Sequence, residues 1–260
     1  MKLLMIGDVM GKPGRQAVAA LLPALKDELA IDFVIANGEN LAAGRGMTEK
    51  TAQVLFEAGA DVITSGNHIW DQREIIPVLE QEVAILRPAN YPAGAPGRGL
   101  LRQGGVTVLN LQGRTFMAAI DCPFQAADAE LESVGENDIV FVDMHAEATS
   151  EKVAMGRYLD GRVTAVVGTH THVPTADAQI LPEGTAFVTD VGMVGAKDSI
   201  IGVEVDAVIG RFLTGMPARL PVAEKSKIVQ FNAVLIDIDE STGRALSITR
   251  VDREFERDGV

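Results

Sequence analysis

The sequence predicts an α/β protein in which βαβ units at the front are followed by antiparallel strands at the back. Short apolar runs recur along the chain, and helical patterns fill several of the gaps between them. The last third of the chain ends instead in segments that alternate apolar and polar residues. No linker, repeat or low-complexity tract interrupts this order, so we expect a single domain over residues 1–260.

The expected strands of the front part are uninterrupted apolar runs. Such runs are typical of strands that are covered on both faces of a sheet. They lie at residues 3–6, 33–36, 62–65, 106–111, 139–144, 163–167 and 186–189.

Helices are expected where apolar residues recur at helical spacing, as Val18, Leu22, Leu25 and Leu29 do. The expected helices are residues 16–29, 49–58, 72–81 and 150–159, the last with Ser150 as N-cap. Residues 227–239 and 245–252 predict a hairpin, and residues 88–99, rich in Pro and Gly, a surface loop. Residues 198–221 resemble an insertion with a short helix, serving as a lid or a subunit contact.

Composition excludes several classes of function. Hydrophobic residues make up 47% and charged residues 23%, the balance of an ordinary soluble protein. A net charge of −13 argues against broad nucleic-acid binding, but it allows a small anionic substrate beside bound cations. The single cysteine, Cys122, indicates a reducing compartment. We find no signal peptide or membrane segment and expect a cytoplasmic protein without membrane contact.

Polar residues follow five of the expected strands, at the point where each strand ends. In α/β sheets the carboxyl ends of the strands form the binding site, so these residues are expected at one edge. All four histidines of the chain belong to this set. It comprises Asp8, Glu39, Asn40, Asn67, His68, His145, His170 and His172.

Each member also has a simpler explanation. Asp8 could be a turn or N-cap residue, Gly38-Glu39-Asn40 and Gly66-Asn67-His68 could be turns, and His145 a core histidine. His170 and His172 are more specific, because residues two apart on an extended segment point the same way. The joint pattern favours a metal site over these separate explanations.

The donor types indicate which metals would bind. Carboxylate, amide and imidazole groups without thiolate suit Mn, Fe or Zn. Seven candidate ligands are too many for one tetrahedral ion, so two ions sharing a bridging carboxylate are expected. Such a pair can polarise a phosphoryl group and generate hydroxide near neutral pH.

These motifs resemble those of the calcineurin-like metallophosphoesterase superfamily. The corresponding segments are Gly7-Asp8-Val9-Met10, Gly38-Glu39-Asn40, Gly66-Asn67-His68, His145 and Thr169-His170-Thr171-His172. Met10 stands where the superfamily usually has a metal-binding histidine, and Glu39 where it has the bridging aspartate. Both departures resemble the YmdB-like subgroup. The resemblance implies a metallophosphoesterase-type four-layer α/β/β/α sandwich, two packed mixed sheets flanked by helices.

The resemblance also implies the role of each site residue. Asp8, Glu39, Asn40 and His172 would hold the first metal, and Glu39 would bridge to the second, held by Asn67, His145 and His170. Asn40 would compensate for the imidazole absent at Met10, and His68 would act as general acid. Two transition-metal ions are implied, divalent or trivalent, with iron expected and manganese or zinc as alternatives.

The function expected from the resemblance is hydrolysis of cyclic nucleotide phosphodiesters. The substrates would be 2′,3′-cyclic nucleotides, with 3′,5′-cyclic AMP as a further candidate, attacked by a metal-bridging hydroxide while His68 protonates the leaving oxygen. The alternatives are a phosphomonoesterase, for example one that acts on phosphoprotein, and a non-catalytic sensor of nucleotide or metal. A homo-oligomer is expected. Any of the basic residues in the expected loops could contact phosphate, but a surface Lys or Arg is usually just solvated, and none is favoured: Lys12, Arg15, Arg45, Arg114 and Lys197. Trp70 could stack on a base, but packing against the following helix is the favoured use.

Overall fold

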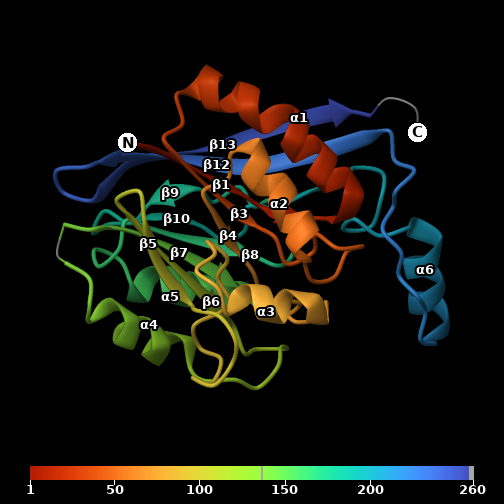
Figure 1. Ribbon diagram of the computed structural model, residues 1–260, viewed down its shortest axis with the longest axis horizontal. Coiled ribbons are helices and arrows are strands. Elements are labelled where there is room, and N and C mark those ends of the chain that lie inside the picture. Colours follow the sequence, from red (N-terminus) through yellow and green to blue (C-terminus); the bar gives the residue numbers. More distant parts are fainter. Residues whose placement is uncertain (136, 258–260) are drawn as a thin grey trace.

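Two mixed β-sheets pack face to face, and helices cover the outer face of each sheet (Figure 1). The computed structural model describes residues 1–135 and 137–257. The first sheet has the order β2-β11-β12-β1-β3-β4, with β13 paired to β12. The second has the order β5-β6-β7-β8-β10-β9. The four-layer α/β/β/α sandwich expected from the sequence is therefore confirmed.

The strands of the first sheet come from both ends of the chain. They are β1 (Lys2–Ile6), β2 (Asp8–Val9), β3 (Phe33–Asn37), β4 (Val62–Thr64), β11 (Met193–Ala196), β12 (Ile228–Asp239) and β13 (Arg244–Glu256). β1, β3 and β4 are parallel, whereas β12 is antiparallel to β1, β11 and β13. The expected hairpin is β12 and β13.

The second sheet is built from the middle of the chain. Its strands are β5 (Leu100–Gln103), β6 (Val106–Gln112), β7 (Ile139–His145), β8 (Ala165–Thr169), β9 (Gln179–Ile180) and β10 (Ala186–Val188). β6, β7, β8 and β10 are parallel, and β5 and β9 are antiparallel edge strands.

The helices divide between the two outer faces. α1 (Gly11–Leu29) and α2 (Glu49–Ala58) pack on the first sheet, and α3 (Ile76–Leu79) joins the same apolar cluster. α4 (Pro123–Leu131) and α5 (Thr149–Tyr158) pack on the second sheet. Because both faces of each sheet are covered, the two sides of β1 are buried, with Leu4 and Ile6 toward the helices and Leu3 and Met5 between the sheets.

Some expected boundaries were wrong. The helix expected at residues 72–81 is a 3₁₀ turn, Arg73–Ile75, followed by the short α3, because Pro77 has no N–H to donate within a longer helix. α5 begins at Thr149 with Ala148 as its N-cap residue, so Ser150 lies inside the helix and is not the cap. β8 begins at Ala165 rather than at residue 163.

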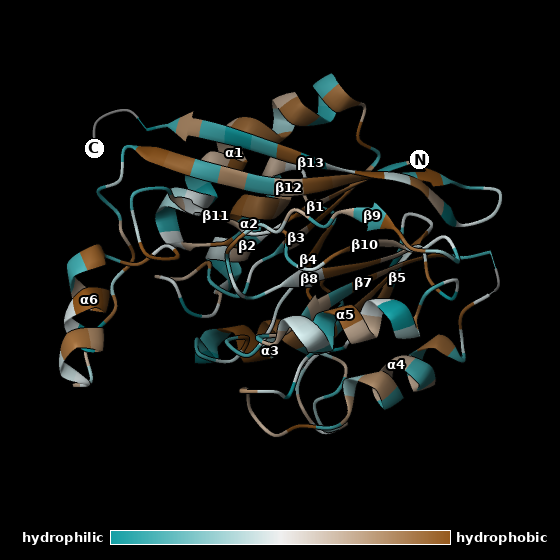
Figure 2. Ribbon diagram, turned by 180° about the vertical axis from the view of Figure 1, so that it is seen from behind, coloured by the Kyte–Doolittle hydropathy of each residue, from teal (hydrophilic) through white to brown (hydrophobic). Residues whose placement is uncertain are grey.

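The segment 198–221 contains α6 (Val205–Thr214), which extends away from the sandwich (Figures 1 and 2). Its side chains Phe212 and Leu213 are 83% and 81% exposed. A role as lid or subunit contact stays a prediction. Within residues 1–135 and 137–257, no helix combines the length and apolar character that crossing a membrane requires.

Gly7 marks the closest approach between the start of the chain and the segment after β10. Its N–H donates to Asn232 O at 3.1 Å, and the next N–H, of Asp8, donates to Gly192 O at 3.0 Å. A Cβ on Gly7 would lie 2.0 Å from Gly192 O, so any side chain there must displace backbone that carries Asp8.

We expect Gly7→Ala to lower the free energy of unfolding by about 1–3 kcal/mol, the usual cost of overpacking. Gly94→Ala is the matched control, because nothing lies within 4 Å of a Cβ at that position. Urea unfolding followed by circular dichroism measures both variants. Equal stability of the two would show that the contact with Gly192 is not as tight as the structure indicates.

Candidate metal centre

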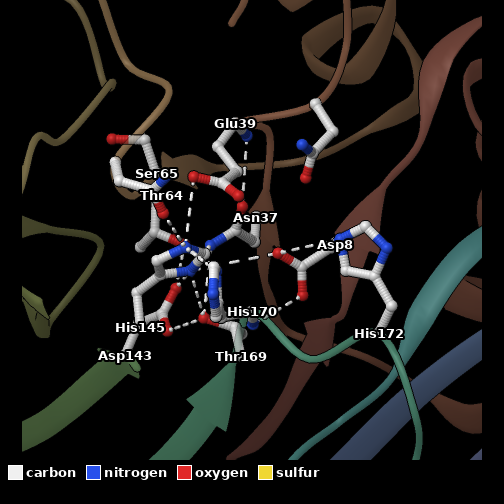
Figure 3. A network of polar contacts seen from close by, with 12 residues as sticks. Asp8, Asn37, Glu39, Thr64, Ser65, Asp143, His145, Thr169, His170 and His172 are labelled. Carbon is white, nitrogen blue, oxygen red and sulfur yellow. Dashed lines mark hydrogen bonds and ion pairs between the residues drawn. The ribbon is translucent and has the colours of Figure 1, made fainter. Parts of the chain in front are cut away.

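The carboxyl ends of β1, β3, β4, β7 and β8 meet at one edge of the sandwich, where the two sheets lie against each other (Figure 3). The first three strands belong to one sheet and the last two to the other. All of the eight predicted residues lie at or directly after these strand ends: Asp8, Glu39, Asn40, Asn67, His68, His145, His170 and His172. The structure thus brings the predicted side chains together at one edge, as expected from the carboxyl ends of parallel strands.

The centre of the group is the ring of His145, which is fully buried. Its Nε2 atom lies 3.1 Å from Glu39 Oε2, 3.0 Å from His170 Nδ1 and 3.3 Å from Asn67 Oδ1. Atoms from Glu39, His145 and His170 lie within 4.8 Å of one another, close enough to coordinate one cation. These four side chains converge from both sheets.

A second group of donors lies beside the first. Asp8 Oδ1 is 4.0 Å from His172 Nε2, and the other oxygen of Asp8 accepts a hydrogen bond from His170 N at 3.1 Å. Asp8 Oδ1 and Asn40 Oδ1 are buried, and neither has a hydrogen-bond partner in the described part of the chain. Buried oxygens without partners are costly, and a cation would satisfy both. The donor set therefore fits a metal ion here.

Gly66 leaves the room that this arrangement needs. A Cβ at Gly66 would lie 2.2 Å from His145 Nε2 and 2.5 Å from Glu39 Oε2. A side chain at this position would therefore occupy the space in which the donor atoms converge. Glycine is therefore required at position 66 to leave space for the donor atoms, in addition to the turn expected for Gly66-Asn67-His68.

His170 and His172 reach the site differently from what was expected. Both have left-handed backbone, with φ of +99° and +64°, so they do not lie on an extended segment. Asp190 fixes this loop, because one of its oxygens accepts from Thr171 N at 3.1 Å and from the buried Lys152 Nζ at 2.6 Å. The strained backbone is held by this ion pair, which the sequence did not indicate.

Each of the three histidines at the centre has its outer ring nitrogen beside a fixed oxygen. His145 Nδ1 lies 2.9 Å from Thr169 Oγ1, and His172 Nδ1 lies 2.9 Å from Ile201 O. His170 Nε2 lies 3.0 Å from Glu147 Oε2. Outer contacts of this kind orient histidine ligands and select the tautomer whose other nitrogen faces a metal.

Behind His145 lies a buried polar network centred on Asp143 (Figure 3). Thr169 Oγ1 donates to Asp143 Oδ1 at 2.7 Å, and Asn37 Nδ2 and Thr64 Oγ1 donate to Asp143 Oδ2. Burial raises the pKa of the Asp143 carboxyl, although His145 and these donors act against the increase. The network joins strands of both sheets directly beneath the donor cluster.

The charges of the cluster depend on one another. Burial would raise the pKa of Glu39, but the charge and hydrogen bond of His145, together with the nearby His68 and His170, lower it overall. Burial would lower the pKa of His145, but Glu39, Asp8 and Asp143 together outweigh burial and raise the pKa to about 9. Burial raises the pKa of Asp8 to about 7. A histidine must be neutral to bind a metal, so a bound cation would take the place of the His145 proton.

His68 lies beside the donor cluster, and its role as general acid stays a prediction. Its Nδ1 lies 2.9 Å from Asp71 Oδ2, and its backbone N–H donates to Glu39 Oε2 at 3.3 Å. With Nδ1 held by Asp71, Nε2 is the ring nitrogen available to a bound molecule. His68 lines the same cavity as His170 and His172.

The cavity above the cluster has a volume of about 330 Å³. Its walls also include Met10, Arg45, Glu147, Ile201 and Leu220. Arg45 is thus placed where a phosphate contact is feasible.

Trp70 packs edge-to-face on Tyr91 with ring centroids 4.5 Å apart and contacts the apolar core of the first sheet. These contacts agree with a packing role for Trp70 rather than with stacking on a base.

The two-sheet sandwich with this donor set at the seam is the architecture of the metallophosphoesterases. The chain belongs to the YmdB-like protein family, which matches residues 4–251. It is 48% identical to a 2′,3′-cyclic-nucleotide 2′-phosphodiesterase of Bacillus subtilis, with 96% of each chain covered.

Two crystal structures have the same fold over nearly their whole length. One is of a hypothetical protein from Thermus thermophilus, with a TM-score of 0.92 and 46% identity, covering 99% of this chain and 100% of that one. The other is of a novel phosphatase from Mycoplasma pneumoniae, with a TM-score of 0.92 and 32% identity, covering 99% of this chain and 95% of that one.

We expect Thr169→Val, which keeps the side-chain volume but removes the acceptor for His145 Nδ1, to weaken metal binding about 10- to 100-fold. Thr64→Val is the control, because it removes a different donor to Asp143 and leaves the contact between Thr169 and His145 intact. Competition titration with a chromogenic chelator measures both affinities. Equal affinities would mean that Thr169 does not orient His145.

Proposed function

We propose that this protein is a metal-dependent phosphodiesterase that hydrolyses cyclic nucleotide phosphodiesters, with 2′,3′-cyclic nucleotides as the favoured substrates. The observation that carries the proposal is the convergence of carboxylate, amide and imidazole donors from both sheets beneath an open cavity. The 48% identity to the Bacillus subtilis phosphodiesterase supports the substrate class.

The ligand assignment follows the two groups of donors. Asp8, Asn40 and His172 would hold one ion, Asn67, His145 and His170 the other, and Glu39 would bridge them. Asp8 Oδ1 and Asn40 Oδ1, which accept no hydrogen bond from residues 1–135 and 137–257, support the first group. The distances around His145 Nε2 support the second. Iron is the expected metal, with manganese or zinc as alternatives.

When bound, a metal pair supplies positive charge that activates water and stabilises the charge developing on a phosphoryl group. The residues of this chain supply the geometry. Water would add to phosphorus opposite the bond to the leaving ribose oxygen, which breaks, and the water would lose one proton to solvent. His68 Nε2 gives its proton to the leaving ribose oxygen. Asp71, 2.9 Å from His68 Nδ1, keeps the ring turned toward the cavity. In a 2′,3′-cyclic substrate, breaking the bond to O2′ leaves a 3′-phosphomonoester.

The other expectations remain part of the proposal: one domain, a cytoplasmic location, a homo-oligomer and a small phosphoester partner. A phosphomonoesterase is the second candidate, because the Mycoplasma pneumoniae structure at 32% identity is called a phosphatase. A non-catalytic sensor is the third candidate. The presence of His68 argues against it, because a protein that only binds a ligand does not need a proton donor.

Substrate preference separates these candidates. The protein would be purified without chelator, its metals quantified, and the same sample assayed on 2′,3′-cyclic AMP, 3′,5′-cyclic AMP and para-nitrophenyl phosphate. We expect about two transition-metal ions per chain, from the two donor groups, and preference for a cyclic diester. Turnover of the monoester alone would indicate a phosphatase, and metal without turnover would indicate a sensor.

We expect His68→Ala to keep its metal and to lose about 10²- to 10⁴-fold in kcat, the contribution of a positioned general acid. Asp8→Asn should instead lose metal and activity together. Metal analysis and steady-state kinetics on the same samples distinguish the two effects. Full turnover by His68→Ala would remove His68 from the mechanism.

A further inference from the structure

Glu147 is an acidic residue of the cavity wall that is not among the proposed metal ligands, although its carboxylate lies beside His170. It lies two residues beyond His145, after the end of β7, and its side chain is 50% exposed. Glu39, the other carboxylate of the cavity wall, is 1% exposed and faces His145. Glu147 is therefore the carboxylate that an entering anion meets on the open side of the site.

The contact with His170 fixes the position of this charge without cancelling it. His170 Nε2 lies 3.0 Å from Glu147 Oε2, while its Nδ1 faces His145. An imidazole whose Nδ1 faces a metal is neutral and donates Nε2–H to the carboxylate as an uncharged group. The negative charge of Glu147 thus stays on the cavity wall, and the hydrogen bond holds it beside the donor cluster.

A fixed negative charge distinguishes the two classes of phosphoester by their own charge. A cyclic phosphodiester carries one negative charge, whereas a phosphomonoester carries nearly two at pH 8, because its second pKa is about 6. Coulomb repulsion is proportional to charge, so the carboxylate repels the dianion about twice as strongly as the monoanion. The product of cyclic diester hydrolysis is itself such a dianion.

We propose that Glu147 is a specificity-determining residue, whose carboxylate disfavours dianionic phosphomonoesters, including the enzyme's own product, relative to monoanionic cyclic diesters. The proposal rests on the proposed function. Cations in the site attract both classes of ester, and Glu147 reduces that attraction more for the monoester. The same repulsion promotes release of the product after the ring has opened.

The variant Glu147→Gln isolates the charge, because the glutamine Oε1 can accept the same hydrogen bond from His170 Nε2. One unit of charge about 7 Å away, in surroundings of dielectric constant between about 40 and 80, changes binding about 3- to 8-fold. Glu82→Gln is the matched control, since Glu82 is exposed and lies outside the cavity.

Two measurements on metal-loaded samples test the charge. The first is the ratio of kcat/KM for para-nitrophenyl phosphate to that for 2′,3′-cyclic AMP, and the second is the calorimetric affinity for 3′-AMP. Glu147→Gln should raise the ratio about 3- to 8-fold over wild type and Glu82→Gln. The affinity for 3′-AMP, which carries nearly two charges, should rise about 7- to 60-fold because the energy of repulsion doubles. Added salt should lessen the difference between wild type and variant, because it screens the exposed carboxylate.

The proposal would be overturned if Glu147→Gln had the same kcat/KM ratio between the two substrates and the same affinity for 3′-AMP as wild type. Loss of metal from Glu147→Gln would also overturn it, because the carboxylate would then act through His170 alone. Failure of the proposed function is a different result, in which metal-loaded wild type hydrolyses no cyclic diester. In that case the affinities of 3′-AMP and 2′,3′-cyclic AMP for wild type and variant still decide the role of Glu147.

Discussion

The contact between Glu39 and His145 is the interaction on which the rest of the site depends. Glu39 follows β3 of the first sheet and His145 ends β7 of the second, and the two side chains meet at 3.1 Å with almost no exposure to solvent. Charges in such a place persist only when they are paired or bound to a cation. Gly66 leaves space for the pair, and Asp143 with Thr169 fixes the imidazole from behind.

Much of the fold and the gathering of the donor residues at one edge could be predicted because both follow from local patterns. Continuous apolar runs identify strands such as β3 and β7, and polar residues at their carboxyl ends must then lie near one another. The short strands β2 and β11 could not be predicted, because their pairing depends on the close approach of Gly7 and Gly192, residues far apart in the sequence.

The residues around the donors were harder to predict than the donors themselves. Asp143 had a local signal, since it lies two residues before His145 and therefore points to the same side of β7. Glu147, Ile201 and Asp190 had none, because loops bring them to His170, His172 and Thr171. The prediction of an extended segment around His170 was wrong because Asp190 and Lys152 hold that loop in a left-handed conformation.

The central position of β1 has a consequence for synthesis of the chain. Residues 2–6 are synthesised long before residues 233–237, with which one edge of β1 pairs. Even the terminal ammonium of Met1 donates to Ile238 O at 3.0 Å. Contacts between residues so far apart in the sequence form slowly, and until they form the nascent protein exposes an unpaired strand edge. Asp8 lies directly after that strand and follows Gly7, which is hydrogen-bonded to β12, so this part of the site is completed only after β12 has been made.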